Sequence, residues 1–343
     1  MKKTLQISLG LLLAAIACAP AWSDDRVRLK AGNEYPGKLV ETSPTKVTLE
    51  IGATRREFDV NAIETVQFDA EPTELTQARA FVRSGRYVDA GRMLAKVTPT
   101  EMRRMEIARD VEFYRSLAAA RHSLAGGSSI ANAGKMMFNF VRANANSYHY
   151  FEACEVLGDL LAALENYAAA ESYYGKVAAA PWPEYKLKAA VLMGRAQVGQ
   201  KKYEAALERF DSVLSSREDS DEAKEHKAAA RLGKASALAG SGRSEEAVAL
   251  IDDIIAQADP KDEALHARAY NLLGSCHQAA GQTQPAILAY LHVDLLYSRF
   301  PELHAEALSN LVKLFEADNK ASRADEARRM LKDKYPNSSW ASK

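Results

Sequence analysis

A short unit recurs along the chain, and it constrains the fold more than any other feature of the sequence. Each copy has a glycine within an alanine-rich apolar stretch and an alanine twelve residues further on. The glycine and alanine of the three clearest copies are Gly158 and Ala170, Gly194 and Ala206, and Gly274 and Ala286. Self-similarity at a period of 20–50 residues is the sequence signature of repeat architectures. From Pro72 onward, the pattern therefore predicts an array of helical hairpins.

The small residues have a physical role in such a hairpin. A glycine midway along the first helix and an alanine on the second allow the two helices to approach closely. Large side chains four residues after the alanines, such as Tyr174 and Phe210, fall on the same helical face and build the core. The 80 residues from Ala90 to Ala170 leave room for one extra, divergent hairpin at about residues 106–143. We therefore expect about seven hairpins.

These residues resemble the tetratricopeptide repeat family, and the resemblance covers about four fifths of the chain. It implies a mainly α fold, an α-solenoid over residues 71–343, in which the first helices line a concave groove. Successive second-helix alanines from Ala170 to Ala327 are 36, 41, 39 and 41 residues apart, whereas the usual unit has 34. We therefore expect longer helices or wider turns than in a regular array.

Residues 24–70 follow a different pattern. Apolar and polar residues alternate in short runs, as in Val47-Thr48-Leu49-Glu50-Ile51, and turn signals such as Gly32-Asn33 and Ser43-Pro44 separate the runs. Alternation with a period of two predicts half-buried strands. Five short strands suggest a small all-β module, a curled sheet or partly closed barrel that resembles the Sm-like class in strand length and order. About 45 residues bury little surface, so we interpret it as a docking or capping module.

Residues 1–23 have the pattern of a secretory signal peptide. Lys2 and Lys3 precede an apolar stretch that is too short to span a membrane. Small residues before Asp24 fit cleavage there, and we favour this simple cleavage. Ala15-Ile16-Ala17-Cys18 also resembles a lipobox, which would leave a lipid anchor on Cys18. The sequence predicts an exported, periplasmic or secreted protein without a membrane span, with a lipoprotein as the alternative.

The charge balance argues against polyanion binding. The chain has 45 Lys plus Arg and 45 Asp plus Glu, so it has no global positive field to hold nucleic acid. The charge is nevertheless unevenly distributed, because residues 71–142 have a net charge of +5 and residues 143–343 of −5. We therefore expect no nucleic-acid partner, and an array that is electrically polar from end to end.

No motif for catalysis, metal or cofactor is found. The seven histidines include no pair at i, i+4 spacing, and there is no Gly-x-Ser-x-Gly or phosphate-binding loop. Cys154 and Cys276 fall in hairpins three repeats apart, too far for a disulfide within one chain. We expect a protein that is not an enzyme, without cofactor or metal, and with two free thiols.

The sequence therefore predicts a noncatalytic interaction scaffold or adaptor of the bacterial cell envelope that binds a polypeptide in its groove. A glycan-binding, peptidoglycan-binding or enzyme-accessory module is the alternative. The candidate groove residues include no aromatic side chain, which favours polypeptide over glycan, because sugar binding usually needs stacked rings. They are Arg79, Arg83, Glu155, Asp159, Lys188, Arg195, Arg268, Asn271 and Gln278.

Arg79, Arg83 and Arg86 are spaced so that they share one helical face, and Arg103, Arg104 and Arg109 follow close behind in the sequence. If this face lines the groove, it would attract an acidic segment of the partner. The competing interpretation is a solvated outer face whose arginines pair with nearby carboxylates such as Asp89 and Glu106.

Overall fold

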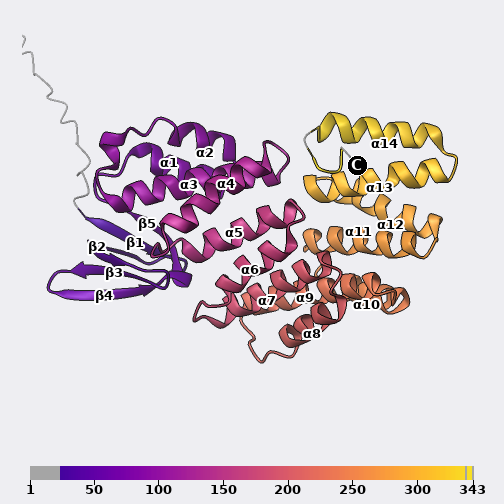
Figure 1. Cartoon of the computed structure of the whole chain (residues 1–343), viewed down its shortest axis with the longest axis horizontal. Helices are drawn as coiled ribbons and strands as arrows, with labels where there is room; N and C mark the ends of the chain where they lie inside the picture. The colour runs from indigo at the N-terminus through magenta and orange to yellow at the C-terminus, as the bar shows by residue number, and fades with distance from the viewer. Residues whose placement is uncertain (1–23, 337, 342–343) are drawn as a thin grey trace, which may run out of the picture.

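The computed structural model describes residues 24–336 and 338–341, and within them a β module precedes fourteen α-helices (Figure 1). The predicted signal peptide and Cys18 lie outside the described residues. The elements are β1 (Asp25–Leu29), β2 (Glu34–Thr42), β3 (Lys46–Ile51), β4 (Thr54–Asp59), η1 (Val60–Ala62), β5 (Ile63–Gln67), α1 (Thr73–Arg83), α2 (Tyr87–Leu94), η2 (Pro99–Met102), α3 (Met105–Leu124), α4 (Ile130–Ala143), α5 (Tyr150–Ala163), α6 (Tyr167–Val177), α7 (Pro183–Gly199), α8 (Tyr203–Leu214), α9 (Asp221–Gly240), α10 (Ser244–Gln257), α11 (Glu263–Ala279), α12 (Thr283–Leu296), α13 (Pro301–Ala317) and α14 (Ala321–Lys334).

The β module is an antiparallel sheet with strand order β4-β3-β2-β1-β5. Its register places Val27 opposite both Tyr35 of β2 and Val66 of β5. The register shifts between Leu39 and Glu41 of β2, and such irregularities bend a strand and increase its twist. The five predicted strands are confirmed. Strands β4 and β5 are the two edges of the sheet, which is therefore curled but open.

The helices pair in sequence order into seven hairpins, from α1–α2 to α13–α14, which confirms the predicted α-solenoid. The divergent hairpin is α3–α4, joined by a turn at Gly126 and Gly127. The wide repeat spacing is explained by helix length, since α9 has 20 residues and α11 and α13 have 17 residues each.

Aromatic rings of the second helices pack directly on the glycines of the first helices. A Cβ atom added at Gly158 would lie 2.3 Å from the Tyr174 ring, and one added at Gly274 would lie 2.8 Å from the Tyr290 ring. These distances are far below a van der Waals contact, so only glycine permits this helix spacing. The predicted role of the repeat glycines is confirmed.

The β module shares one core with the first hairpins. Val27, Leu49 and Phe58 of the sheet belong to the same buried cluster as Leu75 of α1 and Leu94 of α2. The module therefore packs as part of the array rather than as a separate folding unit.

Polar contacts also hold the module against the array. Asp25 is almost fully buried, and its carboxylate accepts hydrogen bonds from the Leu39 and Asp69 backbone amides and from Arg104, whose Nη1 lies 2.7 Å from Oδ1. At the other edge, the Asn61 amide donates a 2.7 Å hydrogen bond to Glu184 of α7.

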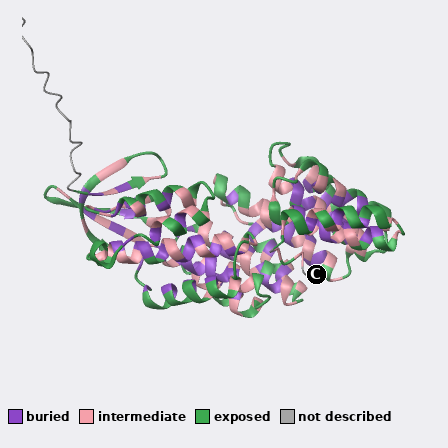
Figure 2. Ribbon diagram, turned by 90° about the horizontal axis from the view of Figure 1, so that it is seen from above, coloured by how far each residue is buried: buried purple, intermediate pink, exposed green. Residues whose placement is uncertain are grey.

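The array forms an elongated superhelix with the β module at one end and the last hairpins at the other (Figure 2). The superhelix curls enough to bring its second and last hairpins together across the groove. The turn between α3 and α4 (Ala125–Gly127) faces α13 and α14 (Figure 1), and residues of both line a cavity of about 190 Å³. The groove is therefore partly closed on this side.

Candidate functional site

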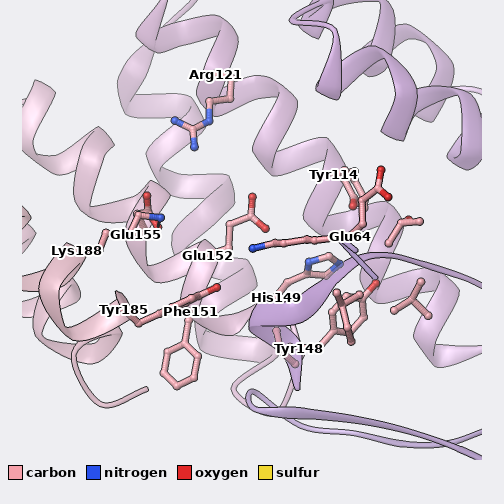
Figure 3. A pocket seen from close by; sticks show the side chains of 15 residues that line it. Glu64, Tyr114, Arg121, Tyr148, His149, Phe151, Glu152, Glu155, Tyr185 and Lys188 are labelled. Carbon is pink, nitrogen blue, oxygen red and sulfur yellow. Dashed lines mark ion pairs between the residues drawn. The ribbon is translucent and has the colours of Figure 1, made fainter. Parts of the chain in front are cut away.

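Polar and aromatic side chains converge where the β module meets the array. A cavity of about 260 Å³ opens between η1 and β5 on one side and α3, α5 and α7 on the other (Figure 3). We call it the junction cavity. Its lining residues are Lys30, Val60, Ile63, Glu64, Thr65, Val66, Tyr114, Arg121, Tyr148, His149, Phe151, Glu152, Glu155, Tyr185 and Lys188.

Glu152 extends into the junction cavity from the first turn of α5 (Figure 3). Its carboxylate makes no hydrogen bond or ion pair with any residue that the structure describes. The side chain is accessible from the cavity, but protein surrounds it on most sides. Burial raises the pKa of Glu152, and the adjacent Glu155 carboxylate raises it further against the opposing effects of His149, Arg121 and Lys188. Glu152 is therefore a carboxylate without a counter-ion of its own.

The two predicted groove residues beside Glu152 pair with each other. Lys188 Nζ lies 2.6 Å from Glu155 Oε2, so the structure brings these candidates together across α5 and α7. One turn along α5, Asp159 accepts a 3.0 Å hydrogen bond from the Tyr174 hydroxyl and lies 3.7 Å from Arg121. Burial and the Glu155 charge nevertheless raise the pKa of Asp159 to about 6. Together with Glu152, this face of α5 has three carboxylates beside the two cations Lys188 and Arg121.

The prediction that Arg79 is an exposed groove residue is wrong. Its side chain is only 4% exposed and is held between Glu71 and Asp110, at 2.7 and 2.6 Å. Asp110 also accepts a hydrogen bond from the Tyr148 hydroxyl, and its Oδ1 lies 3.1 Å from Nε2 of His149. The His149 ring stacks on Phe113. A buried arginine needs such partners, because an unpaired buried charge is very costly. Arg79 is thus part of the wall behind the junction cavity.

Arg83 is exposed, but it does not form a cationic groove surface with Arg79. Its Nη1 lies 3.3 Å from Glu64 of β5, so it bridges α1 to the β module. The competing interpretation holds for the neighbouring arginines, since Asp89 pairs with Arg86 and Arg92, and Glu106 lies 3.8 Å from Arg104. The sequence pattern located the arginines on one helix but gave no information on the carboxylates brought in by the β module.

A second hollow, which we call the arginine cavity, lies further along the concave side. It has a volume of about 450 Å³ and is lined by Arg195, Leu232, Gly233, Ser236, Arg268, Asn271, Leu272, Ser275, Leu303 and Glu306. Arg195 and Arg268 are both exposed, and neither has an ion-pair partner within the described part of the chain. Desolvation and the nearby positive charge of Arg268 lower the pKa of Arg195. Two guanidinium groups are therefore available to an anionic ligand.

The last two predicted groove residues have different environments. Asn271 lines the arginine cavity but is only 2% exposed, and its amide donates hydrogen bonds to the Leu303 carbonyl and to Glu306, at 2.9 and 3.1 Å. The expectation that Asn271 is exposed is therefore wrong, because its side chain joins α11 to α13. Gln278 is half-buried near the end of α11 and lines neither cavity.

Neither cavity contains a recognisable metal or nucleophile site. No group of three or more His, Cys, Asp and Glu side chains among the described residues is arranged to hold a metal ion. Cys154 and Cys276 are both buried, free thiols, as predicted. No helix within the described ranges is long and apolar enough to cross a membrane.

The sequence reasoning missed Glu152 and the aromatic residues of the junction cavity. A signal for Glu152 was present, because it shares a helical face with Glu155 and Asp159 at spacings of three and seven residues. Tyr185 similarly precedes Lys188 by three residues. By contrast, Tyr114 and Tyr148 reach the cavity only because α3, α5 and the β module pack around it, which no local pattern indicates.

Comparison with known proteins supports the fold. No protein-family model matches the sequence, and no curated protein does either. Among solved structures, a tetratricopeptide repeat protein from Parabacteroides merdae is similar with a TM-score of 0.53 and 18% identity, over 76% of this chain and 92% of that one. A Rap protein complexed with Competence and Sporulation Factor has a TM-score of 0.54 and 11% identity, over 78% and 76% of the two chains. The chain has the tetratricopeptide repeat fold, as its sequence resemblance predicted.

Proposed function

We propose that this protein is a noncatalytic scaffold of the bacterial cell envelope that binds a polypeptide partner along its concave side. The observation that carries the proposal is the arginine cavity, where Arg195 and Arg268 are accessible without a counter-ion. Guanidinium groups bind carboxylates in a bidentate geometry, so an acidic segment or a chain terminus fits this position. The Rap neighbour, solved in complex with Competence and Sporulation Factor, gives a precedent for ligand binding by this fold.

The envelope location rests on the pattern of residues 1–23. An exported protein with this pattern is periplasmic or secreted, and lipidation at Cys18 is the less favoured alternative. The signal sequence and the interaction fold together suggest an adaptor that assembles an envelope complex.

Crosslinking in intact cells followed by mass spectrometry identifies the partner, and charge reversal then tests the cavity. We expect Arg195→Glu with Arg268→Glu to slow association with that partner at least tenfold at low salt, because exposed charges accelerate association and are screened by salt. Arg231→Glu with Lys234→Glu, on α9, is the matched control, because both cations already have acidic partners. Equal association rates for the test variant and the parent would contradict the proposed role of the arginine cavity.

Glycan binding is retained as the second candidate function because of one observation. Tyr114, Tyr148, Phe151 and Tyr185 all line the junction cavity, whereas the sequence had placed no aromatic residue along the groove. Saturable binding of chito-oligosaccharides or soluble peptidoglycan fragments, lost on Tyr185→Leu, would favour this candidate over the scaffold.

A further inference from the structure

The junction cavity combines features that the arginine cavity and the cavity between the second and last hairpins do not share. It contains a carboxylate with no partner, Glu152, together with tyrosine and phenylalanine rings from three different helices. Among the other charged lining residues, Lys188 pairs with Glu155, Arg121 with Asp159, and Glu64 with Arg83. Lys30 of the β module lines the same cavity and makes no ion pair with any described residue. Glu152 is therefore the acidic group left available to a ligand.

The aromatic walls favour a cation over a neutral group. Ring faces attract ammonium and guanidinium groups within about 6 Å of the ring centre. Lys188 Nζ already lies 5.9 Å from the Tyr185 ring centre, which shows that this ring lies within reach of a positive charge. The Tyr185 and Tyr114 hydroxyls make no hydrogen bond with any described residue. They are thus free to act as donors or acceptors for a ligand.

We propose that the junction cavity binds a basic side chain, lysine or arginine, of the polypeptide partner, with Glu152 as its counter-ion. This inference rests on the proposed function and assigns the polarity of the partner. The basic residue lies at the end of the groove beside the β module, and the acidic segment lies at the arginine cavity. The order of charges is opposite to the one suggested by the sequence, because Arg79 is neutralised internally and Glu152 is not.

The cavity has a size suited to one side chain. Its volume of about 260 Å³ holds the end of an arginine or lysine with some water, but not a folded domain. The β module forms one wall through Lys30 and the β5 residues, so its position determines whether the cavity exists at all. This gives the module a role in recognition besides capping the array.

The test uses a pair of tripeptides and the whole protein. Acetyl-Gly-Arg-Gly-amide is compared with acetyl-Gly-citrulline-Gly-amide, which has nearly the same shape without the charge, by ligand-observed NMR titration at low salt. We expect the arginine peptide to bind at least tenfold more tightly than the citrulline peptide. We also expect Glu152→Gln to abolish this difference, whereas Glu208→Gln, an exposed carboxylate on α8, leaves it unchanged.

A stability measurement separates recognition from structure. Glu152 has no partner to lose, so Glu152→Gln is expected to leave the Tm unchanged or to raise it, while binding of the arginine peptide is lost. Equal binding of the two tripeptides, or full binding by Glu152→Gln, would overturn the proposal. Binding of chito-oligosaccharides without binding of the arginine peptide would also overturn the proposal and would indicate a glycan site. Because these probes are independent of the natural partner, a negative crosslinking result would reject the proposed scaffold function without affecting this test.

Discussion

At the scale of single residues, the charged side chains of the core have partners of opposite charge, whereas several of those on the concave side do not. Arg79 and Asp110 are buried, and each satisfies the other with further partners around them. The pKa values of Glu152 and Asp159 are raised because burial is not fully offset by opposite charge, and desolvation together with the Arg268 charge lowers the pKa of Arg195. Buried groups with perturbed pKa values cluster at functional sites. The concave side therefore retains charges that folding alone does not require.

The raised pKa of Asp159 predicts a stability gain when its charge is removed. The folded state binds this proton more tightly than the unfolded chain, so the cost of ionising Asp159 appears as the pH rises through about 4 and is fully present above about 6. We expect Asp159→Asn to raise the free energy of unfolding by about 1–2 kcal/mol at pH 7.5. Near pH 3.5, urea denaturation is expected to show little difference from the parent.

Matched denaturation curves at the two pH values check this prediction. Asp221→Asn is the control, because the Asp221 side chain is 95% exposed. An Asp159→Asn protein that is less stable at pH 7.5 would show that the ion pair with Arg121 and the hydrogen bond from Tyr174 outweigh the burial cost.

At the scale of elements, neighbouring helices pack through aromatic rings that lie directly over glycine residues. Phe210 of α8 lies between Gly194 of α7 and Gly233 of α9, where added Cβ atoms would come within 2.7 and 2.4 Å of its ring. Phe210 is fully buried, so the ring has no space into which to move. One side chain therefore sets the spacing of three consecutive helices.

Gly194→Ala is expected to destabilise the array despite the better helix propensity of alanine. Overpacking in a filled core costs about 1–3 kcal/mol, whereas alanine gains about 1 kcal/mol over glycine within a helix. We expect a net loss of about 1 kcal/mol or more, measured as a lower midpoint of urea unfolding. Gly91→Ala on α2 is the control, because no atom lies within 4 Å of its added Cβ, and it should be neutral or stabilising.

The helical hairpins could be predicted well from the sequence, but the contacts between separate elements could not. The glycines, alanines and rings repeat at fixed spacings, so the hairpins, including the divergent α3–α4 pair, could be read from local pattern. The partners of Arg79 and Arg83 could not, since Asp110 comes from α3 of the next hairpin and Glu64 comes from β5 of the β module. Asn271 was misplaced for the same reason, because its hydrogen bonds reach the next hairpin.

At the scale of the whole molecule, the array has its two cavities at separate positions along one concave side. The junction cavity has Glu152 and the arginine cavity has Arg195 and Arg268, none of which forms an ion pair with a residue that the structure describes. Although the net charge is zero, negative and positive side chains are thus separated along the concave side. This arrangement favours a partner whose basic and acidic residues are separated along its chain. Such complementarity contributes more to specificity and association rate than to affinity.

The two thiols should report on opening of the array at two separate places. Cys154 is in α5 and Cys276 is in α11, and burial raises the pKa of each thiol to about 11. The thiolate is the reactive form, so a rise from 9 lowers its fraction by roughly 100-fold near neutral pH. In the protein that begins at residue 24, we expect a thiol-reactive reagent to label Cys154 and Cys276 very slowly in the native state. After denaturation without reductant, we expect both thiols to react. Fast native labelling of either thiol would indicate that its hairpin is open.

The fixed position of Asp25 would limit the distance between the β module and a lipid anchor on Cys18. Asp25 is already held by Arg104 and by the Leu39 and Asp69 amides, and Asp24 is only six positions after Cys18 in the sequence. A chain of that length spans at most about 20 Å. Under the lipid-anchor alternative, the tether would therefore keep the β module and the junction cavity close to the lipid headgroups, with the C-terminal hairpins directed away. Under simple cleavage, no such orientation is imposed, and the cavities are presented in all directions.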